Sequence, residues 1–204
     1  SVNLSNKWLT NATIPAGFYK LRWVKTLDLS NNQLTSYVSL GSVTDLNLSH
    51  NSISQYRVYS TSYYEQNCIG LPNKVDLSYN KLQSFFWWYN TYWYICVNGP
   101  SWLNLSNNQI QSLDLASWKG WSVTMYTYYW PVTTVVPSSP TYLDYSNNAI
   151  KQIADSFTGH TNLQSLKLSG NTNLSDLNQD FINGSWSAIA FKDNITPTDK
   201  TVTI

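Results

Sequence analysis

The sequence predicts a solenoid, mostly of β structure, in which short strands from successive turns stack into one parallel sheet. The prediction rests on a pattern that recurs along the chain, as in "LDLSNNQL" (27–34), "LNLSHNSI" (46–53) and "LNLSNNQI" (103–110). Each copy alternates apolar and polar residues, which is typical of a strand with one buried face. Each copy also places an asparagine just beyond the strand. A single turn cannot bury its apolar side alone, so the turns must stack.

Other copies of the pattern extend it over nearly the whole chain. They are "VDLSYNKL" (75–82), "LDYSNNAI" (143–150) and "LKLSGNTNL" (166–174), with weaker ones at "VNLSNKWL" (2–9) and "IAFKDNI" (189–195). The set resembles the leucine-rich repeat family, whose pattern is L-x-x-L-x-L-x-x-N-x-L. The resemblance implies an α/β-type solenoid with a parallel concave sheet, here as a single domain over residues 1–204 with about eight turns of irregular length.

The recurring asparagine lies where each turn leaves its strand. An amide there can bond to the backbone of its own turn and of the next, which satisfies buried polar groups. We therefore expect a ladder of asparagine side chains, with Lys7 in the place of its first member. The expected ladder consists of Asn32, Asn51, Asn80, Asn108, Asn148, Asn171 and Asn194.

The longest turns carry aromatic-rich inserts, of which "FFWWYNTYWYIC" (85–96) is the densest. It is shorter than the roughly 20 apolar residues that a membrane-spanning helix needs, and Asn90 and Thr91 interrupt it. Tyr, Trp, Val and Thr favour extended chain. We therefore predict a second sheet on the convex face, with strands from Tyr56–Tyr64, Phe86–Val97 and Ser122–Val136.

The rings of these inserts have two interpretations. They either fill a widened core or form an exposed patch, which usually marks an interaction surface. Stacking on sugars has no supporting polar motif. The candidate interface residues are Tyr59, Tyr63, Trp87, Trp88, Tyr92, Trp93, Tyr126, Tyr128 and Trp130.

A polar column between the two strand apolars should line the concave sheet. In the leucine-rich repeat family that face commonly binds the ligand, so the resemblance makes this column a candidate binding site. Short polar residues are also what any solvated strand face carries, and this column contains no aromatic anchor of the kind that dominates binding energy. The candidate ligand-binding residues are Asp28, Asn47, Asp76, Asn104, Asp144 and Lys167.

The two cysteines hold the same place in consecutive turns. Cys68 precedes Asn80, and Cys96 precedes Asn108, by the same number of residues. Neighbouring turns are about 4.8 Å apart, which suits a disulfide. We therefore predict one disulfide and an oxidising compartment; the alternative is a stacked pair of buried free thiols.

Charge and composition narrow the function further. A formal net charge of +1 and only 11% charged residues give no electrostatic reason to expect nucleic acid as a partner. His50 and His160 have no cysteine or carboxylate at ligand spacing, and no phosphate loop or nucleophile elbow is present. We therefore expect neither an enzyme nor a bound metal or other cofactor, and no insertion into a membrane.

The N-x-S/T triplets and the low charge favour a secreted or cell-surface glycoprotein. Triplets at Asn3, Asn47 and Asn104 follow from the repeat itself. Those at Asn11, Asn173 and Asn183 fall in predicted loops, and these we expect to carry N-linked glycans.

The sequence leaves two functions from different classes open. One is a structural glycoprotein that assembles head to tail with copies of itself, because we expect Val2–Leu4 to be an uncovered strand edge and "TVTI" (201–204) alternates like a strand. The alternatives are that 201–204 folds back as a small cap, or that flanking domains supply the caps. Such contacts do not close and would give a filament or a cell-surface matrix, with lateral contacts through the aromatic inserts. The other is a recognition ectodomain that binds a protein or glycan on its concave face.

Overall fold

The structure is a computed structural model that describes residues 1–14, 23–36, 43–54, 72–85, 100–113, 121–126, 131–136, 141–153, 165–174 and 176–177. Over these ranges the regular structure consists of β-strands, with no α-helix. This agrees with a solenoid that is mostly β. None of the ranges contains a helix with the length and apolarity to cross a membrane.

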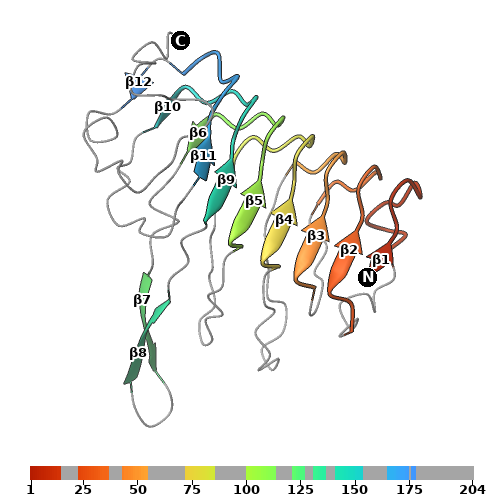
Figure 1. Ribbon diagram of the computed structural model, residues 1–204, viewed down its shortest axis with the longest axis horizontal. Coiled ribbons are helices and arrows are strands. Elements are labelled where there is room, and N and C mark those ends of the chain that lie inside the picture. Colours follow the sequence, from red (N-terminus) through yellow and green to blue (C-terminus); the bar gives the residue numbers. More distant parts are fainter. Residues whose placement is uncertain are drawn as a thin grey trace.

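The main feature is a seven-stranded sheet in the order β1-β2-β3-β4-β5-β9-β11 (Figure 1). Every neighbouring pair in it is parallel. The strands are short and lie side by side along the molecule, one from each turn. Their bounds are Val2–Asn3 (β1), Thr26–Asp28 (β2), Asp45–Asn47 (β3), Lys74–Asp76 (β4), Trp102–Asn104 (β5), Tyr142–Asp144 (β9) and Ser165–Lys167 (β11).

The register of the sheet aligns equivalent residues of the repeat. Leu46 of β3 lies opposite Leu27 and Val75, and the same apolar position continues through the sheet. From β2 to β11 the residues at this position, and the apolar residues that follow each strand, are buried in one continuous core, and Val2 and Leu4 of the first turn pack against it partly buried. Phe85 and Leu113 are buried with them, so an apolar residue beyond the ladder asparagine fills the core in those two turns.

A tight turn follows each strand and uses the left-handed region of backbone conformation. The residue at its bend has φ between 51° and 72° in every described turn. Asparagine and glycine adopt this region at low cost, whereas bulky side chains do not. His50 and Tyr79 are exceptions on neighbouring turns, and their rings stack with centroids 4.2 Å apart. The full column is Asn6, Asn31, His50, Tyr79, Asn107, Asn147 and Gly170.

Gly170 provides a direct test of this turn. Its φ is +72°, and a Cβ added there would lie 2.0 Å from Oδ1 of Asn147. Gly170→Ala is therefore expected to lower the free energy of unfolding by about 1 to 2 kcal/mol, because the Asn147 side chain must move and alanine is strained in this region. Urea unfolding measures the change. Thr172→Ala, at an exposed neighbour, is the control, and equal midpoints for the two variants would contradict the explanation.

The asparagine ladder is present in the described turns. Nδ2 of Asn80 donates to the carbonyls of Leu48, Leu77 and Ser78 at 3.0 to 3.2 Å, and its Oδ1 accepts from the backbone N–H of Ile53 at 2.9 Å. The same side chain thus bonds to its own turn and to the turn before it. Equivalent bonds are made by Asn32, Asn51, Asn108, Asn148 and Asn171.

Two smaller sheets accompany the main one. A parallel sheet in the order β12-β10-β6 joins Ser112–Leu113 (β6), Gln152–Ile153 (β10) and Asp176–Leu177 (β12). The other is an antiparallel hairpin of Trp121–Tyr126 (β7) and Pro131–Val136 (β8). Figure 1 shows the hairpin extending away from the seven-stranded sheet.

The hairpin overlaps one of the three segments from which a convex sheet was predicted. Within the segment Ser122–Val136 the described residues belong to β7 and β8, but these two strands pair with each other. Within the described residues neither strand pairs with another turn. The other two segments of the predicted sheet, Tyr56–Tyr64 and Phe86–Val97, lie outside the described residues. A convex sheet shared by the three inserts therefore stays a prediction.

Candidate binding surface

The solvent side of the seven-stranded sheet, called the sheet face below, corresponds to the predicted concave face. Residues on either side of the central apolar residue of each strand point to it because side chains alternate along a strand. They form two columns across the strands. The first column is Thr26, Asp45, Lys74, Trp102, Tyr142 and Ser165, and the second is Asn3, Asp28, Asn47, Asp76, Asn104, Asp144 and Lys167.

The second column, which contains the predicted ligand-binding residues, has a structural task. Oδ1 of Asp76 accepts a hydrogen bond from the backbone N–H of Ser78 at 2.9 Å and another from its hydroxyl at 2.7 Å. This bond from residue i+2 closes an Asx turn, which directs the chain out of the strand. The same backbone bond is made at Asn3, Asp28, Asn47, Asn104 and Asp144.

Asparagine and aspartate alternate strictly along this column until Lys167 ends it. With Oδ1 in the turn, an aspartate offers Oδ2 to its neighbours and an asparagine offers Nδ2. Nδ2 of Asn104 donates to Oδ2 of Asp76 at 3.4 Å. Alternation also keeps carboxylates two strands apart, about 10 Å at the usual strand spacing. The alternation therefore places an amide donor beside a carboxylate acceptor on neighbouring strands, and between Asn104 and Asp76 the two form a hydrogen bond.

The substitution Asn104→Asp tests whether the alternation of asparagine and aspartate stabilises the sheet. It would place three carboxylates on the neighbouring strands β4, β5 and β9 and is expected to cost about 1 to 3 kcal/mol of stability near pH 7. Acid protonates the carboxylates and removes their repulsion, so the deficit should shrink as the pH falls toward about 4. Urea unfolding at several pH values measures this. Asn107→Asp, in the same turn, is the control, and a pH-independent deficit would contradict the prediction.

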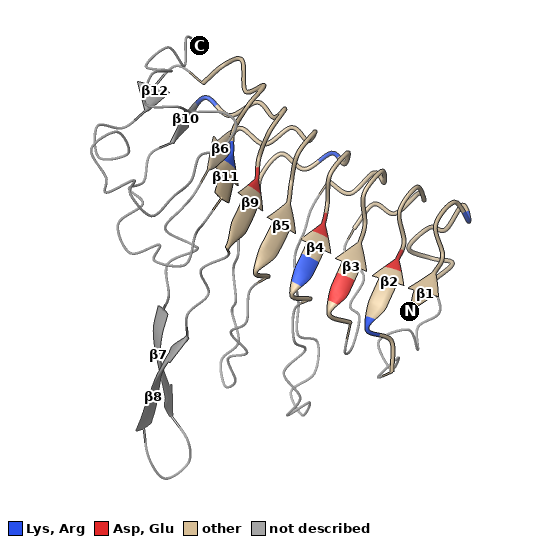
Figure 2. Cartoon of the chain, viewed as in Figure 1, with Lys and Arg blue, Asp and Glu red and all other residues tan. Residues whose placement is uncertain are grey.

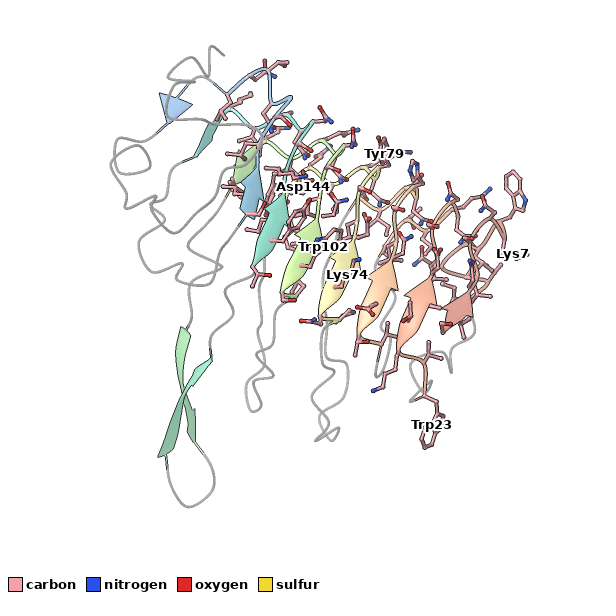
Figure 3. The ribbon with its side chains drawn as sticks, in the orientation of Figure 1. Lys7, Trp23, Lys74, Tyr79, Trp102 and Asp144 are labelled. Carbon is pink, nitrogen blue, oxygen red and sulfur yellow. The ribbon has the colours of Figure 1, made fainter. Side chains whose placement is uncertain are left out.

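An aromatic row crosses four adjacent strands, with three residues from the first column and Lys167 from the second. The rings of Trp102 on β5 and Tyr142 on β9 are stacked, with centroids 5.0 Å apart and planes within 5°. Nζ of Lys74 on β4 lies 4.7 Å from the centroid of Trp102. Nζ of Lys167 on β11 lies 5.6 Å from the centroid of Tyr142. These four residues, Lys74, Trp102, Tyr142 and Lys167, are called the aromatic row below. Figure 3 shows Lys74 and Trp102 on neighbouring strands.

Tyr142 connects the aromatic row to the second column. Its hydroxyl donates to Oδ2 of Asp144 at 3.0 Å. Burial, and then the negative charge of Asp144, raise the pKa of the Tyr142 hydroxyl above its usual range. Tyr142 therefore stays protonated and a hydrogen-bond donor at neutral pH. Both oxygens of Asp144 are thereby bonded within the protein, since Oδ1 also accepts from Ser146.

The aromatic row corrects one interpretation of the sequence. The second column contains no aromatic anchor, as the sequence indicated. The sheet face as a whole does contain aromatic anchors, because Trp102 and Tyr142 lie on it in the first column. Sequence reasoning missed both rings because it took only the residue between the two strand apolars to face solvent. The signal was present two residues earlier, at "WLN" and "YLD", where strand periodicity puts a side chain on that same face.

Several predicted site residues lie outside the described ranges. They include Cys68 and Cys96, so the disulfide stays a prediction, and also Asn183 and Asn194. Among the candidate interface residues, nothing is described of the side chain of Tyr126, although β7 includes it. The remaining ones fall outside, namely Tyr59, Tyr63, Trp87, Trp88, Tyr92, Trp93, Tyr128 and Trp130.

The expected glycosylation sites differ in their surroundings. Nδ2 of Asn11 donates to the carbonyl and hydroxyl of Ser36 at 3.0 Å, and its Oδ1 accepts from the N–H of Thr35 at 2.8 Å. A glycan on Asn11 would replace a proton of an amide that joins two turns. Asn173 is exposed.

If the chain is expressed in a secreting eukaryotic host, occupancy at Asn173 is therefore expected to exceed that at Asn11. Glycopeptide mass spectrometry measures both occupancies on the same sample. Full occupancy at Asn11 with none at Asn173 would contradict this reasoning.

The described residues contain no group of three or more His, Cys, Asp or Glu side chains that could hold a metal ion. His50, one of the two histidines, is exposed and stacks on Tyr79.

Comparison with known proteins agrees with the repeat architecture. The family model for the leucine-rich repeat matches residues 23–41. This stretch contains β2, its turn and Asn32. No curated protein matches the chain. The match of this one repeat, together with the parallel sheet and the asparagine ladder, supports a leucine-rich repeat protein.

Proposed function

We propose that the chain is a non-catalytic interaction module that binds a protein partner on the sheet face, centred on Trp102 and Tyr142. The observation that carries the proposal is the stacked pair of rings on adjacent strands, flanked by lysines. Tryptophan and tyrosine are enriched among residues that dominate binding energy. The leucine-rich repeat match supports an interaction module.

The geometry favours a protein over a glycan at this place. A sugar ring stacks on the open face of an aromatic ring. Lys74 lies over Trp102 from β4, while Tyr142 covers Trp102 from β9, on the other side. Lys167 covers the outer face of Tyr142 in the same way. Ring edges and lysine stems suit the mixed apolar and polar surface of a protein.

The test is a photo-crosslinking amino acid placed at Ser165, beside Tyr142 on the sheet face, and, separately, at Gln109 on the turns. A partner is expected to be captured from position 165 and not from position 109, and its affinity is then measured with purified components. Trp102→Ala should weaken that binding about tenfold or more. Unchanged affinity in Trp102→Ala, with the fold intact by circular dichroism, would refute binding centred on the aromatic row.

Head-to-tail self-assembly is the other function that the sequence suggests, and it stays a prediction. In the described residues β1 pairs only with β2, and Val2 and Leu4 are partly buried. The segment 201–204, which was expected to pair with that edge, lies outside the described residues. The test compares the particle sizes of the full chain and of a variant that lacks Thr201–Ile204. Self-assembly requires that the full chain forms species larger than a monomer and that the deletion removes them.

Secretion to the extracellular space or the cell surface is also part of the proposal. It is supported by the N-x-S/T triplets and the low content of charged residues. Fractionation of the producing cells, followed by detection of the chain, measures where it resides.

A further inference from the structure

We propose that the sheet face takes a basic, arginine-bearing segment of the partner, whose guanidinium group stacks on Trp102 in the place now held by Lys74. This inference rests on the proposed function and specifies the chemistry of the partner. It depends on the two cations that already lie over the rings and on the charge of the rest of the face.

The aromatic row shows that its ring faces accept cations. Two ammonium groups from separate strands lie over it, at 4.7 Å and 5.6 Å from the ring centroids. Such contacts arise from the attraction of a cation to the negative face of an aromatic ring. Lys74 is exposed, so its ammonium can return to water when another cation takes the ring.

Guanidinium is better suited to this position than ammonium. It is planar, is more weakly hydrated and stacks on aromatic faces. It can also form paired hydrogen bonds with a carboxylate while it stacks. An arginine from a partner thus replaces one cation by another, whereas a neutral sugar would have to displace Lys74 without replacing its charge.

The charge of the sheet face favours the same partner. Its described columns contain four aspartates, on β2, β3, β4 and β9, against two lysines, which gives a net charge of −2. Lys25, just before β2, adds a positive charge at the border of the face. The whole chain is near neutral at +1, so the attraction for a basic segment is local to this face. Figure 2 shows the negative residues at the ends of β2, β4 and β9 and on β3.

Asp45 and Asp28 can receive the remaining basic groups of the segment. The carboxylate of Asp45, beside Lys74 in the register, makes no hydrogen bond within the described part of the chain. Asp28 on the neighbouring strand uses one oxygen in its Asx turn. Its other oxygen has no bond to a described residue. These free acceptors lie on β2 and β3, next to the aromatic row on β4 to β11.

The probes are fluorescein-labelled peptides of nine arginines, nine lysines and nine glutamates, measured by anisotropy at about 0.15 M salt, where long-range attraction is screened. The arginine peptide is expected to bind several-fold more tightly than the lysine peptide, and the glutamate peptide not at all. Trp102→Ala should weaken the arginine peptide about tenfold. Trp102→Leu serves if the alanine variant fails to fold.

The deciding variant is Lys74→Met, which opens the face of Trp102 and should strengthen arginine binding about threefold or more. Lys81→Met is its matched control, because it removes the same charge at an exposed position on the turns. An equal effect of the two lysine substitutions would show that net charge alone acts, and would overturn the inference. Equal binding of the arginine and lysine peptides, or none of the arginine peptide, would overturn it as well.

The outcomes separate this inference from the function on which it rests. A captured partner that depends on Trp102, combined with no binding of the arginine peptide, leaves the proposed function standing and refutes the basic segment. Binding of the peptide that Trp102→Ala does not weaken refutes a basic segment on the aromatic row, while the proposed function is judged by the affinity of the captured partner for Trp102→Ala.

Discussion

Asn80→Ala is expected to destabilise the protein by about 3 to 5 kcal/mol. The side chain makes four hydrogen bonds and is buried. The three carbonyls that it bonds keep other donors, namely Asn51, Asn108 and the N–H of His50. The N–H of Ile53 keeps none among the described residues. An unsatisfied buried donor costs about 1 to 3 kcal/mol, and the three lost bonds to carbonyls that keep another donor add roughly 0.7 kcal/mol each.

Urea unfolding followed by circular dichroism measures this loss. Gln109→Ala is the control, because Gln109 is exposed and directly follows the ladder residue Asn108. It should change stability by no more than about 0.5 kcal/mol. A loss below about 1 kcal/mol in Asn80→Ala would mean that the ladder does not join the turns as described.

Leu105→Ala is expected to cost a similar amount, about 3 to 5 kcal/mol. Leu105 follows β5 directly, is completely buried and lies in the middle of the core. Its loss removes apolar burial and leaves a cavity that the flanking turns can fill only in part. Because each turn is stabilised by its neighbours, the defect should weaken the turns on both sides.

The comparison with Trp102→Ala separates folding from function. Trp102 lies on β5 itself, on the sheet face, so its loss should cost only about 1 to 2 kcal/mol through the stacking and the cation contact. Leu105→Ala should lower the unfolding midpoint strongly and leave partner affinity unchanged at temperatures where the variant is folded. Trp102→Ala should lower the midpoint less and weaken partner affinity. Equal losses of stability in the two variants would contradict the assignment of the faces.

The solenoid could be predicted because its determinants are local and repeated. The L-x-L alternation and the asparagine after it fix strand, turn and ladder within a few residues, as in residues 27 to 32. The weak first copy, with Lys7 in place of asparagine, still forms β1, because Asn32 of the next turn accepts from the backbone of Lys7 and Leu9. A strong neighbour compensates for a weak repeat.

The binding surface could be predicted only in part. The sheet face itself follows from the alternation, but the stacking of Trp102 on Tyr142 depends on which turns become neighbours. These two residues are far apart in sequence, and the insert between them includes the hairpin of β7 and β8. The antiparallel pairing of that hairpin was also not predicted. The sequence favours strands there, but composition does not determine which partner a strand takes.

The alternation of asparagine and aspartate along the sheet face limits how the protein can change in length. Removal of any one of the turns that carry β2 to β5 would bring two like residues together, either two carboxylates or two amides. Removal or duplication of two successive turns would preserve the order. We therefore expect longer and shorter versions of this chain to tolerate an even change in turn number better than an odd one. Two successive turns are thus the smallest unit by which such a chain can lengthen or shorten without disturbing the column, although each turn has its own copy of the repeat.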